Sequence, residues 1–188
     1  MLEVPWRVAL LAWVGAAALK ACMVAAYRST DFEVHRNWFA ITASVPLARW
    51  YYEDTSEWTL DYPPLFAWFQ RALGLLAPLF DEKMLHISAA PYESAATVLF
   101  QRLSVIASET VLLLAVVVFS RASTDGSSKR PAPAAALLLA LNAGIFITDH
   151  VHFQYNGLLL GLLMLSAVMI NNSCHLGNHI SNSLPLLY

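Results

Sequence analysis

Charged residues are scarce in this chain, since only 13% of its 188 residues are Asp, Glu, Lys or Arg. A soluble domain carries about 25%, so the composition excludes an ordinary soluble fold. Hydrophobic residues make up 58% of the chain, the mean hydropathy is +0.54, and the apolar residues come in long blocks. The composition therefore predicts an integral membrane protein.

Cysteine is scarce as well, and the charges nearly balance. Cys22 and Cys174 lie far apart and lack the spacing of metal ligands, so they indicate two unrelated thiols. A formal net charge of −2 gives no reason to expect a nucleic-acid partner. No internal repeat stands out.

Apolar segments at residues 8–26, 98–119, 134–148 and 155–170 are candidates to cross a bilayer. Each is expected to be a helix, because lipid offers no partner for backbone hydrogen bonds. A fifth stretch, 65–80, would reach only about 24 Å, short of a hydrocarbon core of about 30 Å. It also carries Gln70 and Arg71, so an interfacial or re-entrant helix is favoured over a fifth span.

The loop at residues 120–132 is basic, with Arg121, Lys129 and Arg130 against Asp125, and is therefore expected to be cytoplasmic. With four spans, the loop 27–97 and the loop after residue 148 then share the luminal or external face. The first apolar segment could instead be a signal peptide, which leaves 27–97 on the same side. Residues 171–188 form an atypical tail with no clear element.

The first polar motif, residues 31–38, places two carboxylates, an imidazole and a guanidinium directly after an apolar segment. In a helix, the i, i+4, i+7 spacing brings Asp31, His35 and Trp38 to one face. Such a helix could present Asp31 to a substrate. Alternatively, Asp31 only begins an interfacial helix, where the dipole favours it, and Trp38 anchors the helix in the membrane.

A second motif, residues 57–64, ends in the tandem prolines Pro63 and Pro64, which fix an extended turn before a helix. The turn would hold Asp61 and Tyr62 at the membrane surface, where an acid and an aromatic ring suit sugar binding. The alternative is a helix-entry turn within an aromatic belt.

The third motif, residues 149–157, could in principle bind a metal through Asp149, His150 and His152, although this pattern is a weak signal. Hydrogen bonding to a polyol or phosphate suits its Asp, His, Gln and Asn side chains better. Within 98–119, Glu109 is expected to face protein. Arg102 could contact a lipid phosphate or extend to the headgroups.

The polar motifs occur in a fixed order: D-F-E-V-H-R-N-W at 31–38, S-E-W-T-L-D-Y-P-P at 56–64, P-Y-E-S at 91–94 with F-Q-R at 100–102, and D-H-V-H-F-Q-Y-N-G at 149–157. Together they resemble the dolichyl-phosphate-glucose-dependent α-1,3-glucosyltransferases of the endoplasmic reticulum. The first motif is more similar to the enzyme that adds the second glucose than to the one that adds the first.

The resemblance implies an all-α integral membrane protein, a multi-span GT-C type helical bundle with about four transmembrane helices here. Residues 1–170 would be the amino-terminal part of the glucosyltransferase domain, and 27–97 a luminal loop of interfacial helices. The implied donor is dolichyl-phosphate-glucose and the implied acceptor is Glc1Man9GlcNAc2-PP-dolichol, both in the endoplasmic reticulum membrane. Transfer would invert the anomeric centre without a metal or other cofactor. Since family members are far longer, a non-catalytic fragment is the alternative, and so is the first enzyme of the pathway.

The resemblance also implies roles for individual residues. Asp31, the first acid of the first luminal loop, would be the general base that activates a sugar hydroxyl. Departure of the lipid phosphate requires cations or hydrogen-bond donors. The candidate substrate-binding residues are Glu33, His35, Arg36, Asp61, Tyr62, Arg102, Asp149, His150, His152, Gln154 and Asn156.

Overall fold

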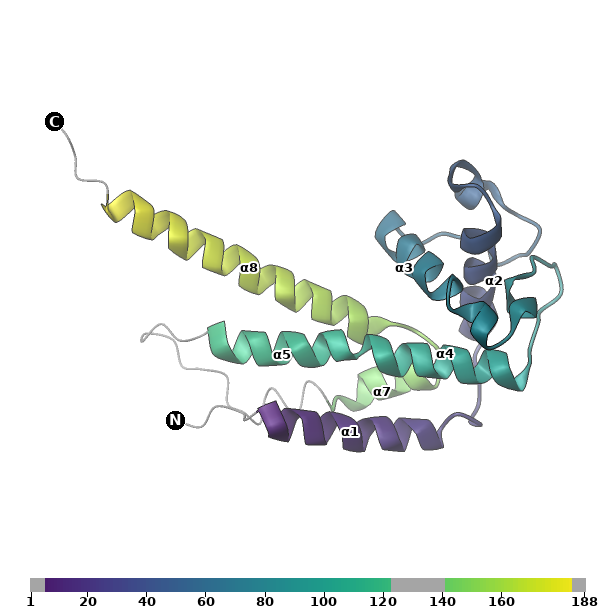
Figure 1. The fold of residues 1–188 in the computed structure, drawn as a ribbon, viewed down its shortest axis with the longest axis horizontal. Helices are drawn as coiled ribbons and strands as arrows, with labels where there is room; N and C mark the ends of the chain where they lie inside the picture. The colour runs from purple at the N-terminus through teal and green to yellow at the C-terminus, as the bar shows by residue number, and fades with distance from the viewer. Residues whose placement is uncertain (1–5, 123–140, 184–188) are drawn as a thin grey trace. The chain divides into compact units, whose positions relative to one another are not determined.

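The computed structural model describes residues 6–122 and 141–183, and within these ranges the chain is helical and contains no strand (Figure 1). This agrees with the all-α class that the sequence predicts. The longer helices are α1 (Trp6–Cys22), α2 (Asp31–Ser44), α3 (Pro64–Gly74), α4 (Ala95–Ser108), α5 (Thr110–Ala122), α7 (Ala143–His150) and α8 (Asn156–Ser183). Short 3₁₀ helices are η1 (Leu47–Tyr52), η2 (Ala77–Leu79) and η3 (Glu82–Leu85).

The helices form two compact units. Unit 1 comprises Met1–Ala18, Ser108–Ile145 and Tyr155–Tyr188, and unit 2 comprises Leu19–Ala107 and Phe146–Gln154. Unit 2 contains α2, α3 and the 3₁₀ helices, and therefore most of the polar motifs.

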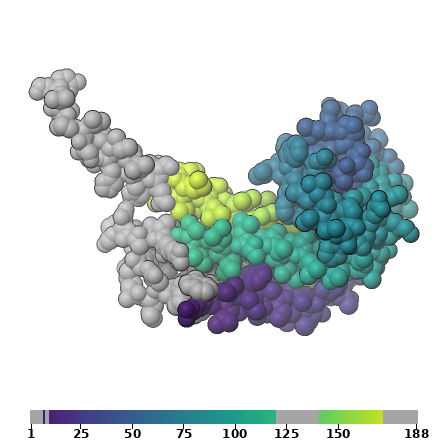
Figure 2. All heavy atoms as spheres, viewed as in Figure 1, coloured from purple at the N-terminus to yellow at the C-terminus, as the bar shows by residue number. Residues whose placement is uncertain are grey.

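In unit 1, α5 packs along α8, and their atoms lie against each other in teal and yellow-green in Figure 2. Gly161 permits this close approach, because a Cβ atom there would lie 2.7 Å from the backbone nitrogen of Leu112. Small residues at helix contacts commonly serve this purpose in membrane proteins. The sequence indicated no element after residue 170, but α8 continues to Ser183.

One helix among the described residues, Ala95–Phe119, is long and apolar enough to cross a membrane, and it coincides with the expected span 98–119. Glu109, within it, is buried as expected. The segments expected to span at 8–26 and 155–170 contain the shorter apolar helices Leu10–Cys22 and Asn156–Asn171. Of the span expected at 134–148, residues 134–140 lie outside the described residues, and α7 covers residues 143–148.

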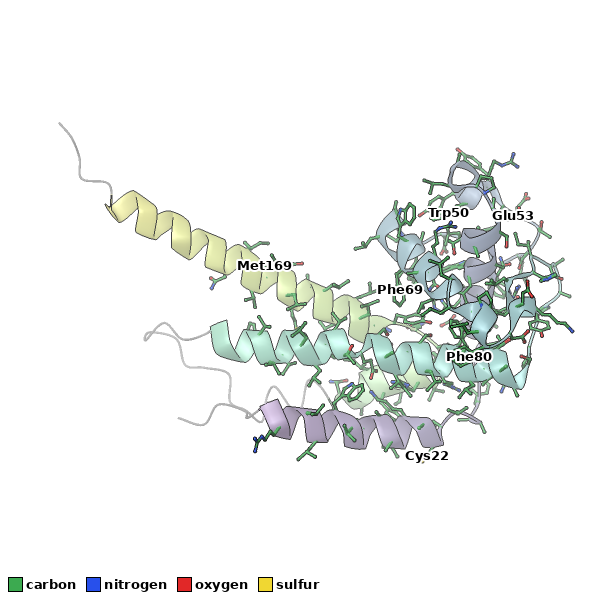
Figure 3. The ribbon with its side chains drawn as sticks, viewed as in Figure 1. Cys22, Trp50, Glu53, Phe69, Phe80 and Met169 are labelled. Carbon is green, nitrogen blue, oxygen red and sulfur yellow. The ribbon has the colours of Figure 1, made fainter. Side chains whose placement is uncertain are left out.

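The apolar stretch 65–80 is divided between α3 and η2 and does not form one long helix. At ~1.5 Å per residue, the 11 residues of α3 reach about 16 Å, too short to cross a hydrocarbon core. Pro63 has extended backbone angles and Pro64 occupies the first helical turn, which confirms the predicted extended turn before a helix. Figure 3 labels Phe69 on α3 and Trp50 of η1, and the Trp50 ring lies with its centroid 5.2 Å from that of Trp68 on α3. The helix within 65–80 is thus short, as expected for an interfacial or re-entrant helix, and its position in the membrane stays a prediction.

The core of unit 2 is built around α2. One buried cluster joins Phe39, Ala77, Met84 and Phe100, and a second joins Phe32, Val98 and Phe153. A buried ion pair fixes the helix further: the single N–H at Nε of Arg36 donates a bifurcated hydrogen bond to both oxygens of the Glu33 carboxylate, at 3.0 Å each. Arg36 also donates to the carbonyl oxygens of Met84 at 3.1 Å and His86 at 2.6 Å, which ties α2 to η3.

We expect Gly161→Ala to destabilise the protein by roughly 1–3 kcal/mol, because the new methyl group would lie 2.7–2.9 Å from backbone atoms of Val111 and Leu112, which would have to shift. Gly15→Ala in α1 is the matched control. A Cβ at Gly15 meets nothing within 4 Å, so the better helix propensity of alanine should leave stability unchanged or raise it by up to about 1 kcal/mol. Thermal unfolding of the purified protein in detergent measures both. Equal effects of the two substitutions would contradict the close packing of α5 on α8.

We expect Glu33→Gln to destabilise the protein by about 3–5 kcal/mol, because it leaves the buried guanidinium of Arg36 without its counter-charge. Glu93→Gln removes the carboxylate of the exposed pair with Arg28 and should cost less than about 1 kcal/mol. Unfolding in increasing denaturant measures both variants against the parent. A Glu33→Gln variant as stable as Glu93→Gln would show that the buried pair does not hold α2.

Candidate active site

Unit 2 contains a cavity of about 360 Å³ beside the first turns of α2. Its walls come from α2, from the segment 57–62 and from the end of the loop after α7. The lining residues are Asp31, Val34, His35, Trp38, Glu57, Trp58, Thr59, Asp61, Tyr62 and Gln154. Three of the polar motifs that the sequence singled out therefore contribute to one cavity.

One face of α2 supplies the first wall. The helix begins at Asp31, where the hydroxyl oxygen of Ser29 accepts a hydrogen bond from the Asp31 N–H at 3.2 Å. Asp31, His35 and Trp38 all line the cavity, which confirms the face predicted from their i, i+4, i+7 spacing. Asp31 is half-buried, whereas His35 and Trp38 are almost completely buried.

The segment 57–62 supplies the opposite wall and is held by side chains of α2. Asn37 donates from Nδ2 to the Trp58 carbonyl oxygen at 3.0 Å, and Trp38 donates from Nε1 to that of Thr59 at 2.9 Å. These bonds place Asp61 and Tyr62 at the cavity.

The ring of Tyr62 packs against Trp38, with ring centroids 4.8 Å apart, and against Phe66 at 4.9 Å. Partial burial raises the pKa of Tyr62 above its usual value, and the nearby carboxylates of Asp31 and Asp61 raise it further. Tyr62 is therefore a neutral phenol over the physiological pH range. Its hydroxyl can donate or accept a hydrogen bond.

His35 is also uncharged. Burial lowers the pKa of its imidazole to about 3, and the Gln70 amide nitrogen lies 3.1 Å from Nδ1. The sequence did not predict a role for Gln70, although a polar residue in the middle of an apolar helix was a signal that it had a specific partner. His35 is thus held as a neutral imidazole at the cavity wall.

Gln154 reaches the cavity from the loop after α7. Its Nε2 donates a hydrogen bond to Oδ2 of Asp31 at 2.8 Å, across a separation of 123 residues in the chain. Ser29 Oγ donates to the carbonyl oxygen of His152 at 2.7 Å and fixes the same loop beside the start of α2. The first and third motifs therefore meet directly.

Several sequence-predicted site residues lie away from the cavity. Glu33 and Arg36 form the buried ion pair, and Glu33 also accepts a hydrogen bond from the Tyr92 N–H at 3.1 Å. Arg102 is buried, donates to the Tyr27 carbonyl oxygen at 3.0 Å, and lies with its guanidinium 3.8 Å from the ring centroid of Phe153. These side chains make contacts within the protein.

The remaining predicted residues are spread over the third motif. Asp149 and His150 are buried at the end of α7, and His152 is exposed. Asn156 begins α8 and belongs to unit 1. Among the described residues, no group of three or more His, Cys, Asp or Glu side chains is placed to hold a metal ion.

Comparison with known sequences shows where the chain belongs. The profile of the ALG6, ALG8 glycosyltransferase family matches residues 16–186. The chain is a member of this family. It is 53% identical over 154 residues to a Neurospora crassa protein named dolichyl pyrophosphate Glc1Man9GlcNAc2 alpha-1,3-glucosyltransferase, covering 82% of this chain and 30% of that protein.

Animal proteins are similar as well. A mouse protein of the same name is 46% identical over 168 residues, covering 87% of this chain and 32% of the mouse protein. A Drosophila melanogaster protein, named as a probable enzyme of this kind, is 52% identical over 151 residues, with 80% and 30% covered. The chain therefore spans about a third of the length of the curated relatives it matches.

The chemistry of the cavity fits a family of glycosyltransferases. Its ionisable carboxylates are Asp31, Glu57 and Asp61, and its lining residues include no lysine or arginine. Such a wall favours an uncharged ligand rich in hydroxyl groups over an anionic one. A half-buried carboxylate beside neutral hydrogen-bonding groups can accept a proton from a bound hydroxyl.

We expect the stability of the protein to fall as the pH drops from 7 to 5, in part because of His35. The folded imidazole titrates near pH 3, whereas an unfolded one titrates near 6.5, so between these values the unfolded state binds the extra proton. The stability that His35 contributes is present above pH 6.5 and is lost as the pH falls, by at most about 1.4 kcal/mol per pH unit. His35→Asn should reduce this acid sensitivity.

Thermal unfolding at pH 7 and pH 5 measures the loss of stability, with the exposed His86→Asn as control. An unchanged pH dependence in His35→Asn would contradict a buried neutral imidazole.

Proposed function

We propose that this chain carries the catalytic base of an inverting α-1,3-glucosyltransferase that uses dolichyl-phosphate-glucose. The observation that carries the proposal is the cavity in which Asp31, half-buried at the start of α2, accepts a hydrogen bond from Gln154. The acceptor is the lipid-linked oligosaccharide Glc1Man9GlcNAc2-PP-dolichol, and the product carries the second α-1,3-linked glucose. The names of the relatives support this acceptor.

The transfer is a single displacement at the anomeric carbon of the donor glucose. Asp31 accepts the proton of an acceptor hydroxyl while the oxygen of that hydroxyl attacks the anomeric carbon. The bond between this carbon and the phosphate oxygen breaks, and its electron pair leaves with dolichyl phosphate. Attack from the face opposite the phosphate converts a β-linked donor into an α-linked product. The leaving group is a single lipid phosphate, so the mechanism uses no metal or other cofactor.

Asp31 is a better base than the other two carboxylates of the cavity because of its position. It begins a helix whose opposite side is fixed by the Glu33–Arg36 pair, whereas Glu57 and Asp61 are exposed residues of a segment without regular structure. A base that is held rigidly reacts more efficiently. Glu57 and Asp61 are suited to accept hydrogen bonds from sugar hydroxyls.

The aromatic residues of the cavity provide the apolar part of a sugar site. Trp38, Trp58 and Tyr62 all line it. The neutral imidazole of His35 lines it as well and packs against Trp38 and Phe66. The faces of pyranose rings carry C–H groups that pack on such rings, and their hydroxyls bond the neighbouring polar groups. The site therefore receives the acceptor sugar.

The reaction takes place on the luminal side of the endoplasmic reticulum membrane. The chain crosses this membrane several times, with the loop 27–97 and the loop that holds Gln154 facing the lumen. The apolar helix Ala95–Phe119 and the basic composition of residues 120–132 support this orientation.

Asp31→Asn should lower glucose transfer by about 100- to 10,000-fold, since the amide cannot accept the proton. The test uses the Neurospora crassa relative in which the aligned segment is replaced by this chain, expressed in a strain that lacks its own enzyme. The chain by itself is assayed in parallel. Microsomes receive dolichyl-phosphate-glucose and either the Glc1Man9GlcNAc2 or the Man9GlcNAc2 lipid-linked acceptor.

Asp54→Asn is the matched control, because Asp54 is an exposed carboxylate that does not line the cavity. Transfer retained in Asp31→Asn would overturn the assignment of the base. If the chimera without a substitution transfers no glucose, the proposed activity is contradicted. If it prefers the Man9GlcNAc2 acceptor, the chain belongs to the enzyme that adds the first glucose instead. Activity of the chain alone would show that this segment suffices.

A further inference from the structure

The contact between Gln154 and Asp31 has a defined direction. An amide nitrogen can only donate, so the 2.8 Å bond from Nε2 of Gln154 occupies Oδ2 of Asp31 as an acceptor. Among the described residues, no side chain donates to the second oxygen, Oδ1. The bond therefore fixes the rotation of the carboxylate while one oxygen stays available to a ligand in the cavity.

The backbone just before Gln154 is in an unusual conformation. Phe153 has a φ of 60°, the only positive φ at a residue other than glycine in the part of the chain that the structure describes. This left-handed region is sparsely populated by bulky residues and persists only where surrounding contacts impose it. Such strained residues cluster at functional sites.

Contacts of the Phe153 ring with two neighbours impose this conformation. The ring is fully buried, lies edge-on to Phe32 with centroids 5.2 Å apart, and has the guanidinium of Arg102 at 3.8 Å from its centroid. The backbone N–H of Gln154 donates to the carbonyl oxygen of Thr148 at 3.2 Å. Phe153 and Arg102 thus hold the loop so that the next side chain points at Asp31.

We propose that Gln154 is a positioning residue that orients the Asp31 carboxylate, and that Phe153 and Arg102 act as a clasp that holds Gln154 in place. This inference rests on the proposed function, since it needs Asp31 to be the base. Gln154 then acts through Asp31 and not by binding the sugar, and Arg102 acts through the loop and not by binding the leaving phosphate.

Kinetics can distinguish a positioning role from a binding role. Misplacing a base by about 1 Å can slow a reaction by about 100-fold without changing how well the substrate binds. Loss of a substrate contact instead raises KM, and loss of an interaction made only in the transition state lowers kcat. We therefore expect Gln154 variants to lower kcat with KM nearly unchanged.

The test uses two variants in the same chimera, Gln154→Met and Gln154→Glu. Methionine has a similar length and no donor, and glutamate has the same shape but places an acceptor against Asp31. Initial rates are measured in microsomes over a range of acceptor concentrations and normalised to the amount of protein. We expect kcat to fall at least ~10-fold in both, more in Gln154→Glu, with KM within about twofold of the parent.

The control is Asp54→Asn, an exchange between carboxylate and amide at an exposed residue that does not line the cavity. Its kcat should match that of the parent. A second pair, Phe153→Leu and the control Phe80→Leu, tests the clasp: only Phe153→Leu should lower kcat.

The outcomes separate this inference from the proposed function. An unchanged kcat in Gln154→Met, or a raised KM with an unchanged kcat, would overturn the positioning role while loss of activity in Asp31→Asn still supports the base. An unchanged kcat in Phe153→Leu would overturn the clasp. A parent chimera without transfer, or an active Asp31→Asn variant, would overturn the proposed function and this inference together.

Discussion

The buried ion pair between Glu33 and Arg36 is the interaction on which the geometry of unit 2 depends. It lies on the side of α2 away from the cavity and reaches the carbonyl oxygens of Met84 and His86 as well as the Tyr92 N–H. An apolar pair could pack in the same space, but it would leave these backbone groups without partners, at a cost of about 1–3 kcal/mol for each buried group. The charged pair therefore fixes the rotation of α2 about its own axis, and with it the direction in which Asp31 and His35 face.

A consequence of this arrangement is that the cavity contains carboxylates but no positive charge. The nearby arginines of unit 2 are engaged elsewhere, Arg36 by Glu33 and the carbonyl oxygens, and Arg102 by Tyr27 and the ring of Phe153. His35 is kept neutral by burial. In the proposed reaction, this wall of the site activates a sugar hydroxyl, and the groups that stabilise the departing phosphate come from outside the cavity. Separating the two tasks keeps a cation from occupying the Asp31 carboxylate in place of a sugar hydroxyl.

The sequence predicted the features that follow from local rules. The helical spacing of Asp31, His35 and Trp38 gave their common face, and the prolines at 63 and 64 gave the start of α3. It could not predict contacts that depend on the path of the chain between distant segments. The Gln70–His35 and Gln154–Asp31 bonds join residues 35 and 123 positions apart, and the second also requires a left-handed backbone at a phenylalanine. Arg36 and Arg102 looked like ligands for a phosphate because their charge is visible in the sequence, whereas their carbonyl partners are not.

Phe153 shows why such a conformation can be retained. A left-handed backbone at a residue other than glycine costs roughly 1–3 kcal/mol. A glycine would remove that cost, but it would also remove the ring that contacts both Phe32 and Arg102. A desolvated cation over an aromatic ring contributes about 2 kcal/mol, and an edge-on aromatic pair about 0.5–1.5 kcal/mol. The free energy of these contacts is similar to the cost of the left-handed backbone. The loop therefore keeps its conformation only while both Phe32 and Arg102 contact the ring. The position of Gln154 on Asp31 is therefore coupled to α4 through Arg102 and to α2 through Phe32, and the carboxylate is oriented by the core of unit 2 and not by the loop alone.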